Sequence, residues 1–182
     1  EVVAGYAHTC ALDSAGALTC WGCGGDFASG QCDVPTGSAW VAVAPGWKHT
    51  CAIDEDAAIH CWGDNSAGQS TPPAGTFVAI GAGWSHNCAA GTDGSLACWG
   101  DSSAGATTPP AGSFTAVTGG QTSTCAIAEG GALTCFGCDN EDQGQCSPPA
   151  GAFTDIGSGF FHACALRDDG EALCWGQALP GP

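Results

Sequence analysis

Fourteen cysteines in 182 residues are the side chains of this sequence with the most evident chemistry. A thiol density this high is typical either of disulfides formed in an oxidising compartment or of metal ligation. Two spacings, Cys20–Cys23 and Cys135–Cys138, are Cys-x-x-Cys, as in zinc and dithiol redox sites. His86 lies two residues before Cys88, and residues two apart on a strand share a face. A partial zinc site is therefore one hypothesis.

The cysteines belong to an internal repeat, which favours disulfides over zinc and over redox chemistry. Five pairs share a spacing of ten residues, and an aromatic residue and a glycine follow each second cysteine. The pairs are Cys10 and Cys20, Cys51 and Cys61, Cys88 and Cys98, Cys125 and Cys135, and Cys164 and Cys174. We interpret the chain as one repeat domain, residues 1–182, with units at approximately 1–36, 37–73, 74–110, 111–149 and 150–182.

The four remaining cysteines lie in two enlarged loops. Cys23 and Cys138 take positions that are aspartate in other units, and the loops that follow them are longer by three and two residues. We expect Cys23–Cys32 and Cys138–Cys146 to close these loops, which explains both Cys-x-x-Cys spacings without a redox site. All fourteen cysteines are then predicted to be oxidised, in sequential pairs within units.

The third unit shows the local structure that positions these cysteines. If Cys88 and Cys98 lie opposite each other on two antiparallel strands, residues 92–94 form a three-residue turn. Gly94 then takes the place where a positive φ is needed. Three other units have glycine there, and the second unit has Ala57. Opposed cysteines in a non-hydrogen-bonded pair are close enough to form a disulfide.

A further apolar strand precedes each hairpin, as at residues 77–80, and a Pro-Pro-Ala-Gly turn introduces it in the later units. Proline cannot donate to a sheet, so these turns connect the units. One unit is therefore three or four short antiparallel strands, the size of one propeller blade.

The repeat resembles that of the regulator of chromosome condensation family. The second unit carries the motif well, with Gly-Trp-Lys-His-Thr-Cys-Ala-Ile at 46–53 and Cys-Trp-Gly-Asp-Asn-Ser-Ala-Gly-Gln at 61–69. The resemblance implies an all-β propeller of four-stranded blades, often seven. Five units are present here, so either the N-terminal strand closes the ring or a neighbouring subunit completes an open edge. The acidic, cysteine-rich chain is most similar to a secreted bacterial branch that includes inhibitors of β-lactamases.

The charge of the chain excludes several classes of partner. The sequence has eighteen acidic residues and only two basic ones, Lys48 and Arg167, which gives a net charge of −16. Such a surface repels nucleic acids and anionic lipids, and no apolar run approaches the ~20 residues of a membrane span. With the cysteine content, this predicts a secreted or cell-surface protein.

Two sets of polar residues could bind metal. The histidines at positions 8, 49, 86 and 162 recur two residues before a cysteine, and Ser123 replaces the fourth. We expect them to be buried and bonded to backbone between blades, rather than to bind zinc. Asp139, Glu141 and Asp142 lie in one acidic loop that could hold calcium, but the glutamate expected at position twelve of a calcium loop is Ala150. We expect a solvated loop and no cofactor, with calcium as the alternative.

Aromatic residues two positions before the histidines are the best candidates for a binding surface. We expect Tyr6, Trp47, Trp84 and Phe160, with Phe161 beside them, to form an exposed arc on one rim of the propeller. The sequence predicts a structural or adhesive module that binds protein, with self-assembly into an oligomer or filament as one form of this. The alternative is a protein- or glycan-recognition module, such as an inhibitor or a lectin-like binder. No catalytic constellation is found, and we do not predict an enzyme.

Overall fold

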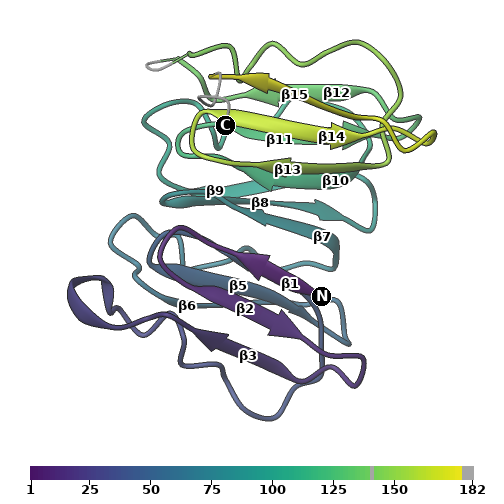
Figure 1. Ribbon diagram of the computed structural model, residues 1–182. Helices are drawn as coiled ribbons and strands as arrows, with labels where there is room; N and C mark the ends of the chain where they lie inside the picture. Colours follow the sequence, from purple (N-terminus) through teal and green to yellow (C-terminus); the bar gives the residue numbers. More distant parts are fainter. Residues whose placement is uncertain (140–141, 178–182) are drawn as a thin grey trace.

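The computed structural model describes residues 1–139 and 142–177, which form five three-stranded antiparallel sheets (Figure 1). Each sheet corresponds to one repeat unit and is called a blade. Blade 1 holds β1 (Val2–Ala4), β2 (Thr9–Leu12) and β3 (Leu18–Trp21), followed by the short 3-10 helix η1 (Gly25–Phe27); blade 2 holds β4 (Trp40–Pro45), β5 (His49–Asp54) and β6 (Ile59–Gly63). Blade 3 holds β7 (Phe77–Ala82), β8 (His86–Gly91) and β9 (Leu96–Gly100); blade 4 holds β10 (Phe114–Gly119), β11 (Thr124–Ala128) and β12 (Leu133–Phe136); blade 5 holds β13 (Asp155–Ser158), β14 (His162–Leu166) and β15 (Ala172–Gly176). The all-β propeller architecture predicted from the repeat is confirmed.

The register within each hairpin places the two cysteines opposite each other. In blade 3, Cys88 pairs with Cys98 and Ala90 with Leu96, and the Cα atoms of the two cysteines are 4.1 Å apart. This separation is that of a non-hydrogen-bonded pair, in which side chains approach most closely. The turn places Gly94 at φ +81° and its counterpart in blade 2, Ala57, at φ +63°. Ala57 is therefore held in a backbone conformation that disfavours any residue with a Cβ atom.

Seven disulfides form, five across the hairpins and two in the enlarged loops. The hairpin disulfides of blades 1 to 4 lie between blades, where Cys51 and Cys88 are fully buried. Cys23–Cys32 and Cys138–Cys146 close the longer loops after β3 and β12. We therefore expect the blade fold to depend on these covalent links, because the small side chains of the sheets bury little apolar area.

The disulfide of blade 5 differs from the other four hairpin disulfides in its surroundings. Cys164 opposes Cys174 in the same register, with Cα atoms 4.0 Å apart, so the pair itself is the one expected from the spacing. Cys174, however, is exposed, whereas the second cysteine of every other hairpin is at least partly buried. The repeat pattern gives no sign of this difference. It arises because no further blade covers this side of blade 5.

Every blade has two faces, which we name by the neighbour that they contact. The forward face packs on the next blade along the chain, and the backward face packs on the preceding one. In blade 2 the forward face carries Cys51 and Ile53, and the backward face carries Val43, Ala52 and Trp62. Forward and backward faces meet in four hydrophobic clusters, one between each pair of consecutive blades.

The five blades form an open arc among the described residues, because no hydrophobic cluster joins blade 5 to blade 1. The N-terminal strand β1 pairs with β2 inside its own blade, so it does not close a ring by pairing with blade 5. Figure 1 shows the blade of β1–β3 and the blade of β13–β15 as the two ends of the series. The strand-β3 tryptophan, Trp21, is 49% exposed at one of these ends, whereas its equivalent Trp62 is 8% exposed. Trp21 is exposed because no blade among the described residues covers this side of blade 1.

Candidate functional site

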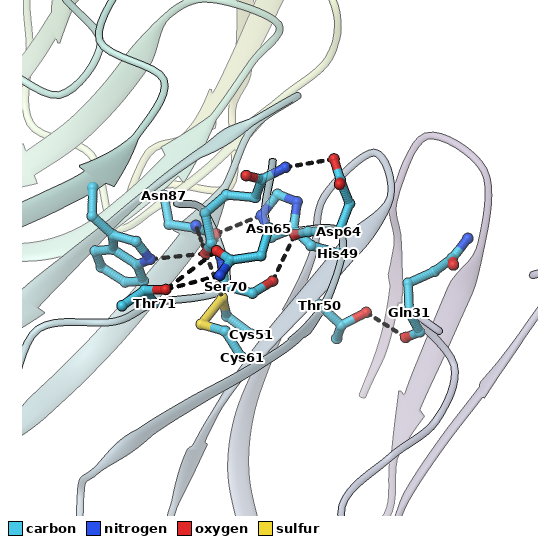
Figure 2. Close-up of a disulfide and its surroundings, with 12 residues drawn as sticks. Gln31, His49, Thr50, Cys51, Cys61, Asp64, Asn65, Ser70, Thr71 and Asn87 are labelled. Atoms are coloured by element: carbon cyan, nitrogen blue, oxygen red, sulfur yellow. Dashed lines mark hydrogen bonds between the residues drawn. A yellow bond between two sulfur atoms is a disulfide. The ribbon is translucent and has the colours of Figure 1, made fainter. Parts of the chain in front are cut away.

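The repeated histidines connect neighbouring blades. Nε2 of His49 lies 2.8 Å from Oδ1 of Asn87 in the next blade, beside the Cys51–Cys61 disulfide (Figure 2). The equivalent bonds join His8 to Thr50 at 2.8 Å and His86 to Thr124 at 3.0 Å. The predicted hydrogen bond between blades is present, but its partner is a side chain and not the backbone group that the sequence predicts. The side chain before the first cysteine of the next blade reaches the ring, and that side chain in turn donates to a backbone carbonyl; Asn87, for example, donates to Gln69.

Burial keeps these histidines neutral. Desolvation lowers the pKa of His86 to about 4, and His49 acts in the same direction because two protonated imidazoles so near each other would repel. The pKa of His8 is lowered to about 4, and that of His49 is lowered, mainly by desolvation as well. The cysteines near them are disulfide-bonded and carry no thiolate for a metal. Within residues 1–139 and 142–177 no group of three metal-ligating side chains is present, and the histidines act as buried connectors.

The interface between blades 4 and 5 lacks both members of this hydrogen bond. Ser123 stands where the other units have histidine, and Ala163 stands where its partner would lie. The partner side chain is thus absent where the histidine is replaced by the shorter serine, since a histidine without its partner in this buried position would carry an unsatisfied polar group.

The five predicted rim aromatics form one cluster instead of an extended arc. We call Tyr6, Trp47, Trp84, Phe160 and Phe161 the aromatic cluster. Its ring centroids are 4.5 Å apart for Trp47 and Trp84, 5.1 Å for Trp84 and Phe160, and 5.4 Å for Tyr6 and Trp84. Four blades contribute to it, and Tyr6 contacts rings from three other blades. The side chains converge because they extend from the inner ends of the blades toward the same space.

Backbone contacts at glycines place these side chains. The amide of Tyr6 donates to Gly46 of blade 2, and the amide of Trp84 donates to Gly120 of blade 4, both at 3.2 Å. A Cβ atom on Gly83, just before Trp84, would lie 2.6 Å from the Gly120 carbonyl oxygen. Glycine before the aromatic residue is therefore needed for the loops of adjacent blades to approach.

The aromatic cluster lies at one end of a central cavity of about 760 Å³. The inner strands β1, β4, β7, β10 and β13 line this cavity, largely with small residues such as Ala82, Gly119 and Ser158. The sequence reasoning did not identify the cavity. The signal that could have revealed it is the run of small residues at the ends of the inner strands, which leaves the centre unfilled.

The cluster also has polar character. The indole Nε1 of Trp47 and Oε1 of Gln121 are buried and have no hydrogen-bond partner among the described residues. The ammonium of Lys48 lies 4.7 Å from the centroid of the Trp47 ring, a cation–π distance. One of the two basic side chains of a chain with net charge −16 therefore sits beside the cluster.

The acidic loop does not assemble a calcium site in the described residues. Glu141 lies outside them, and the carboxylate of Asp142 accepts a hydrogen bond from the amide of Gly144 at 2.7 Å. The calcium alternative stays a prediction. Among the described residues, no helix has the length and apolar character needed to cross a bilayer.

Comparison with solved structures finds two receptor-kinase ectodomains and a yeast protein of the same fold. The CRINKLY WD40 ectodomain of the Arabidopsis thaliana receptor kinase ACR4 is 26% identical with a TM-score of 0.75, over 98% of this chain and 64% of that one. The ectodomain of the Physcomitrella patens receptor kinase CR4 is 25% identical with a TM-score of 0.77, over 94% of this chain and 50% of that one. Prp20p of Saccharomyces cerevisiae shares the fold at 17% identity and a TM-score of 0.77, over 96% and 56% of the two chains. The chain thus spans between half and two thirds of the length of these proteins.

No curated protein matches the chain significantly in sequence. The regulator of chromosome condensation (RCC1) repeat, in contrast, matches residues 1–31, 40–69, 77–106 and 153–177. The unmatched stretch contains the fourth unit, the one in which Ser123 replaces the histidine. These matches cover more than half of the sequence, and the chain belongs to the RCC1 repeat family.

Proposed function

We propose that this chain is an extracellular protein-recognition module that binds its partner through the aromatic cluster. The observation that carries the proposal is the convergence of five aromatic side chains from four blades at the mouth of the central cavity. Tyr6 is 60% exposed, and the other members of the cluster are partly exposed. Aromatic side chains bury a large area and lose little rotamer entropy, so a few of them can dominate an interface.

The polar groups around the cluster fit a partner that brings its own hydrogen-bonding atoms. The unpaired Nε1 of Trp47 can donate to a carbonyl, and the unpaired Oε1 of Gln121 can accept from an amide. A peptide segment offers both groups at each residue. The high negative charge favours a partner with basic residues near the contact, since opposite potentials speed association.

The arrangement of the rings favours protein over glycan. Sugars stack on a flat, open aromatic face, whereas the rings of this cluster are inclined to one another, by 32° for Tyr6 and Trp84 and by 85° for Tyr6 and Trp47. The surface offered is therefore irregular and suited to insertion of an apolar side chain. One relative supports the same class of partner, since structures of yeast Prp20p are described with its binding to Gsp1p and histones and in complex with Kap60.

Selection from a phage-displayed random peptide library against the intact chain tests the proposal. The double variant Trp47→Ala/Trp84→Ala should lose binding of the selected peptides by roughly a hundredfold, as expected for two interface tryptophans. Trp21→Ala is the matched control, because it removes an exposed indole from the far end of blade 1. Selected peptides that bind the folded double variant as tightly as the wild type would contradict the proposal. If the double variant unfolds, the milder Tyr6→Ala decides, since that side chain is mostly exposed.

A structural or adhesive role is the second candidate, and a different observation supports it. The two ends of the arc expose apolar side chains, Val2 and Trp21 on blade 1 and Leu166 on blade 5, at positions that the internal blades bury wholly or in part.

A further inference from the structure

The backward face of blade 1 has the composition of a buried interface but lacks a neighbour. Val2 is 70% exposed, whereas its equivalent in blade 2, Val43, is 6% exposed. Trp21 is exposed where Trp62 is buried, in the same pattern. Both side chains are of the type that fills the four internal clusters. Their exposure on a single face is unusual, because monomeric soluble proteins seldom leave large apolar side chains grouped in this way.

The forward face of blade 5 is the second blade face that has no neighbouring blade among the described residues. Leu166 is 39% exposed, whereas its equivalent Ile53 in blade 2 is 1% exposed. His162 and Cys164 are partly exposed, whereas the histidines and cysteines at these positions in blades 1 to 3 are buried. The exposed Cys174 lies on the same hairpin, opposite Cys164. This face therefore presents, in the same register, the side chains that blades 1 to 3 bury against their successors.

The polar groups of the two faces also match. In three internal interfaces a histidine of the forward face bonds Thr50, Asn87 or Thr124 of the backward face. Blade 5 carries His162 at the histidine position, and blade 1 carries Thr9 at the acceptor position. Neither side chain has a hydrogen-bond partner among the described residues. At the interface of blades 4 and 5 the histidine position holds the shorter Ser123 and the partner position holds Ala163, so the two positions change together.

We propose that the forward face of blade 5 binds the backward face of blade 1 of a second copy of this chain, with His162 of one copy bonded to Thr9 of the other. The apolar side chains, the strand register and the histidine bond match those of the internal interfaces. The loop carbonyl that accepts from Trp62 and Trp99, supplied by Gln31 and Gln69, has no counterpart among the described residues of blade 5. A second copy is the occupant because its blade 1 carries this complementary set of groups.

The contact is heterologous, and it repeats. Each copy added through its blade 1 leaves its own blade 5 free for the next copy, which gives an open chain unless the rotation closes. Five blades already curve around one central cavity, with the ring of Tyr6 in blade 1 only 6.0 Å from that of Phe160 in blade 5. Ten blades in one plane would therefore overlap, so successive copies have to rise along the axis. The assembly expected is a helical filament rather than a closed ring.

Molar mass measured by light scattering over a range of concentrations tests this interface. The wild-type chain should exceed its monomer mass of 17.8 kDa increasingly with concentration, with filaments visible by electron microscopy. Val2→Glu and Leu166→Glu should each abolish growth of the filament. Val41→Glu is the matched control, because Val41 is a comparably exposed valine (58%) on an inner strand of blade 2, away from both ends. His162→Ala should weaken association roughly two- to tenfold, as for loss of one hydrogen bond.

Mixing the two end variants identifies the partner faces. Val2→Glu retains a working blade 5 and Leu166→Glu retains a working blade 1, so an equimolar mixture should form one-to-one dimers and stop there. Assembly of either variant alone as efficiently as the wild type would contradict the proposal. A wild-type chain that stays at the monomer mass up to millimolar concentration would also overturn it. Neither result bears on the aromatic cluster, which lies outside the end faces.

Discussion

Acidification from pH 7 to pH 5 should destabilise the protein, because His86 is buried as a neutral imidazole. The ring of His86 is buried in the interface of blades 3 and 4, where it forms a hydrogen bond with Thr124. His49 and Asp101 lie nearby. The pKa of His86 is lowered from 6.5 to about 4, with desolvation as the largest cause. The unfolded chain takes up this proton near pH 6.5, and the folded chain does so only near pH 4. Stability is therefore complete above pH 6.5 and is lost as the pH falls toward 4.

The magnitude follows from the two pKa values. At pH 5 the unfolded chain carries almost a full proton at this site and the folded chain about a tenth of one, which corresponds to a loss of about 2 kcal/mol. This is a large part of the 5–15 kcal/mol that is typical of a folded domain. His8 and His49 have their pKa lowered for the same reason and act in the same direction.

Guanidinium unfolding of the disulfide-intact chain at pH 7, 6 and 5 measures this effect. His86→Gln should lose about 2 kcal/mol less than the wild type between pH 7 and pH 5. Thr124→Ala is the matched control, since it removes the same interblade hydrogen bond but leaves the imidazole buried. That variant should be less stable at every pH and keep the wild-type pH dependence. Equal pH dependence of His86→Gln and the wild type would refute the reasoning.

Three further outcomes follow from the structure. Ala57→Gly should raise the free energy of unfolding by about 0.5–1 kcal/mol because it relieves a positive φ. Gly170→Ala, at φ +87° with open space around it, should lower the free energy of unfolding. Equal effects of the two changes in denaturant titrations would count against this account. Replacing Cys51 and Cys61 by serine should lower the free energy of unfolding by about 3 kcal/mol or more on the chain-entropy estimate. The loss should exceed that for the same change at Cys23 and Cys32, because Cys51 and Cys61 also fill a buried cluster. Thermal melting of the two variants measures the difference. Strong reductant should lower the melting temperature by tens of degrees, and an unchanged transition would show that the blades fold without their disulfides.

The structure within each blade could be predicted from the sequence because it is local. A spacing of ten between cysteines, with a glycine at the turn, determines which residues oppose each other in a hairpin with a three-residue loop. The disulfide Cys88–Cys98 and the positive φ at Ala57 both follow from that register. Similarly, the equal offset of each aromatic residue from its histidine predicts that these side chains emerge at the same end of the blades.

What lies between blades could not be predicted in the same way. The partner of His49 is Asn87, 38 residues along the chain, and the choice of this side chain over a backbone carbonyl depends on how one blade is rotated against the next. The contact of Tyr6 with Phe160 across the centre depends on the curvature of the whole arc. The exposure of Trp21 likewise depends on the absence of a covering blade, and its own repeat unit has the same pattern as those in which the tryptophan is buried.

Hydroxyl-radical footprinting of the dilute monomer, with mass-spectrometric detection of oxidised tryptophan, tests the central claim that the five blades form an open arc. Trp21 and Trp62 occupy the same position in adjacent blades, so their intrinsic reactivity is the same and only their surroundings differ. The open arc predicts rapid oxidation of Trp21, which is about half exposed, and protection of Trp62. Equal protection of both tryptophans in the monomer would show that another blade covers the end face, and would contradict the open arc.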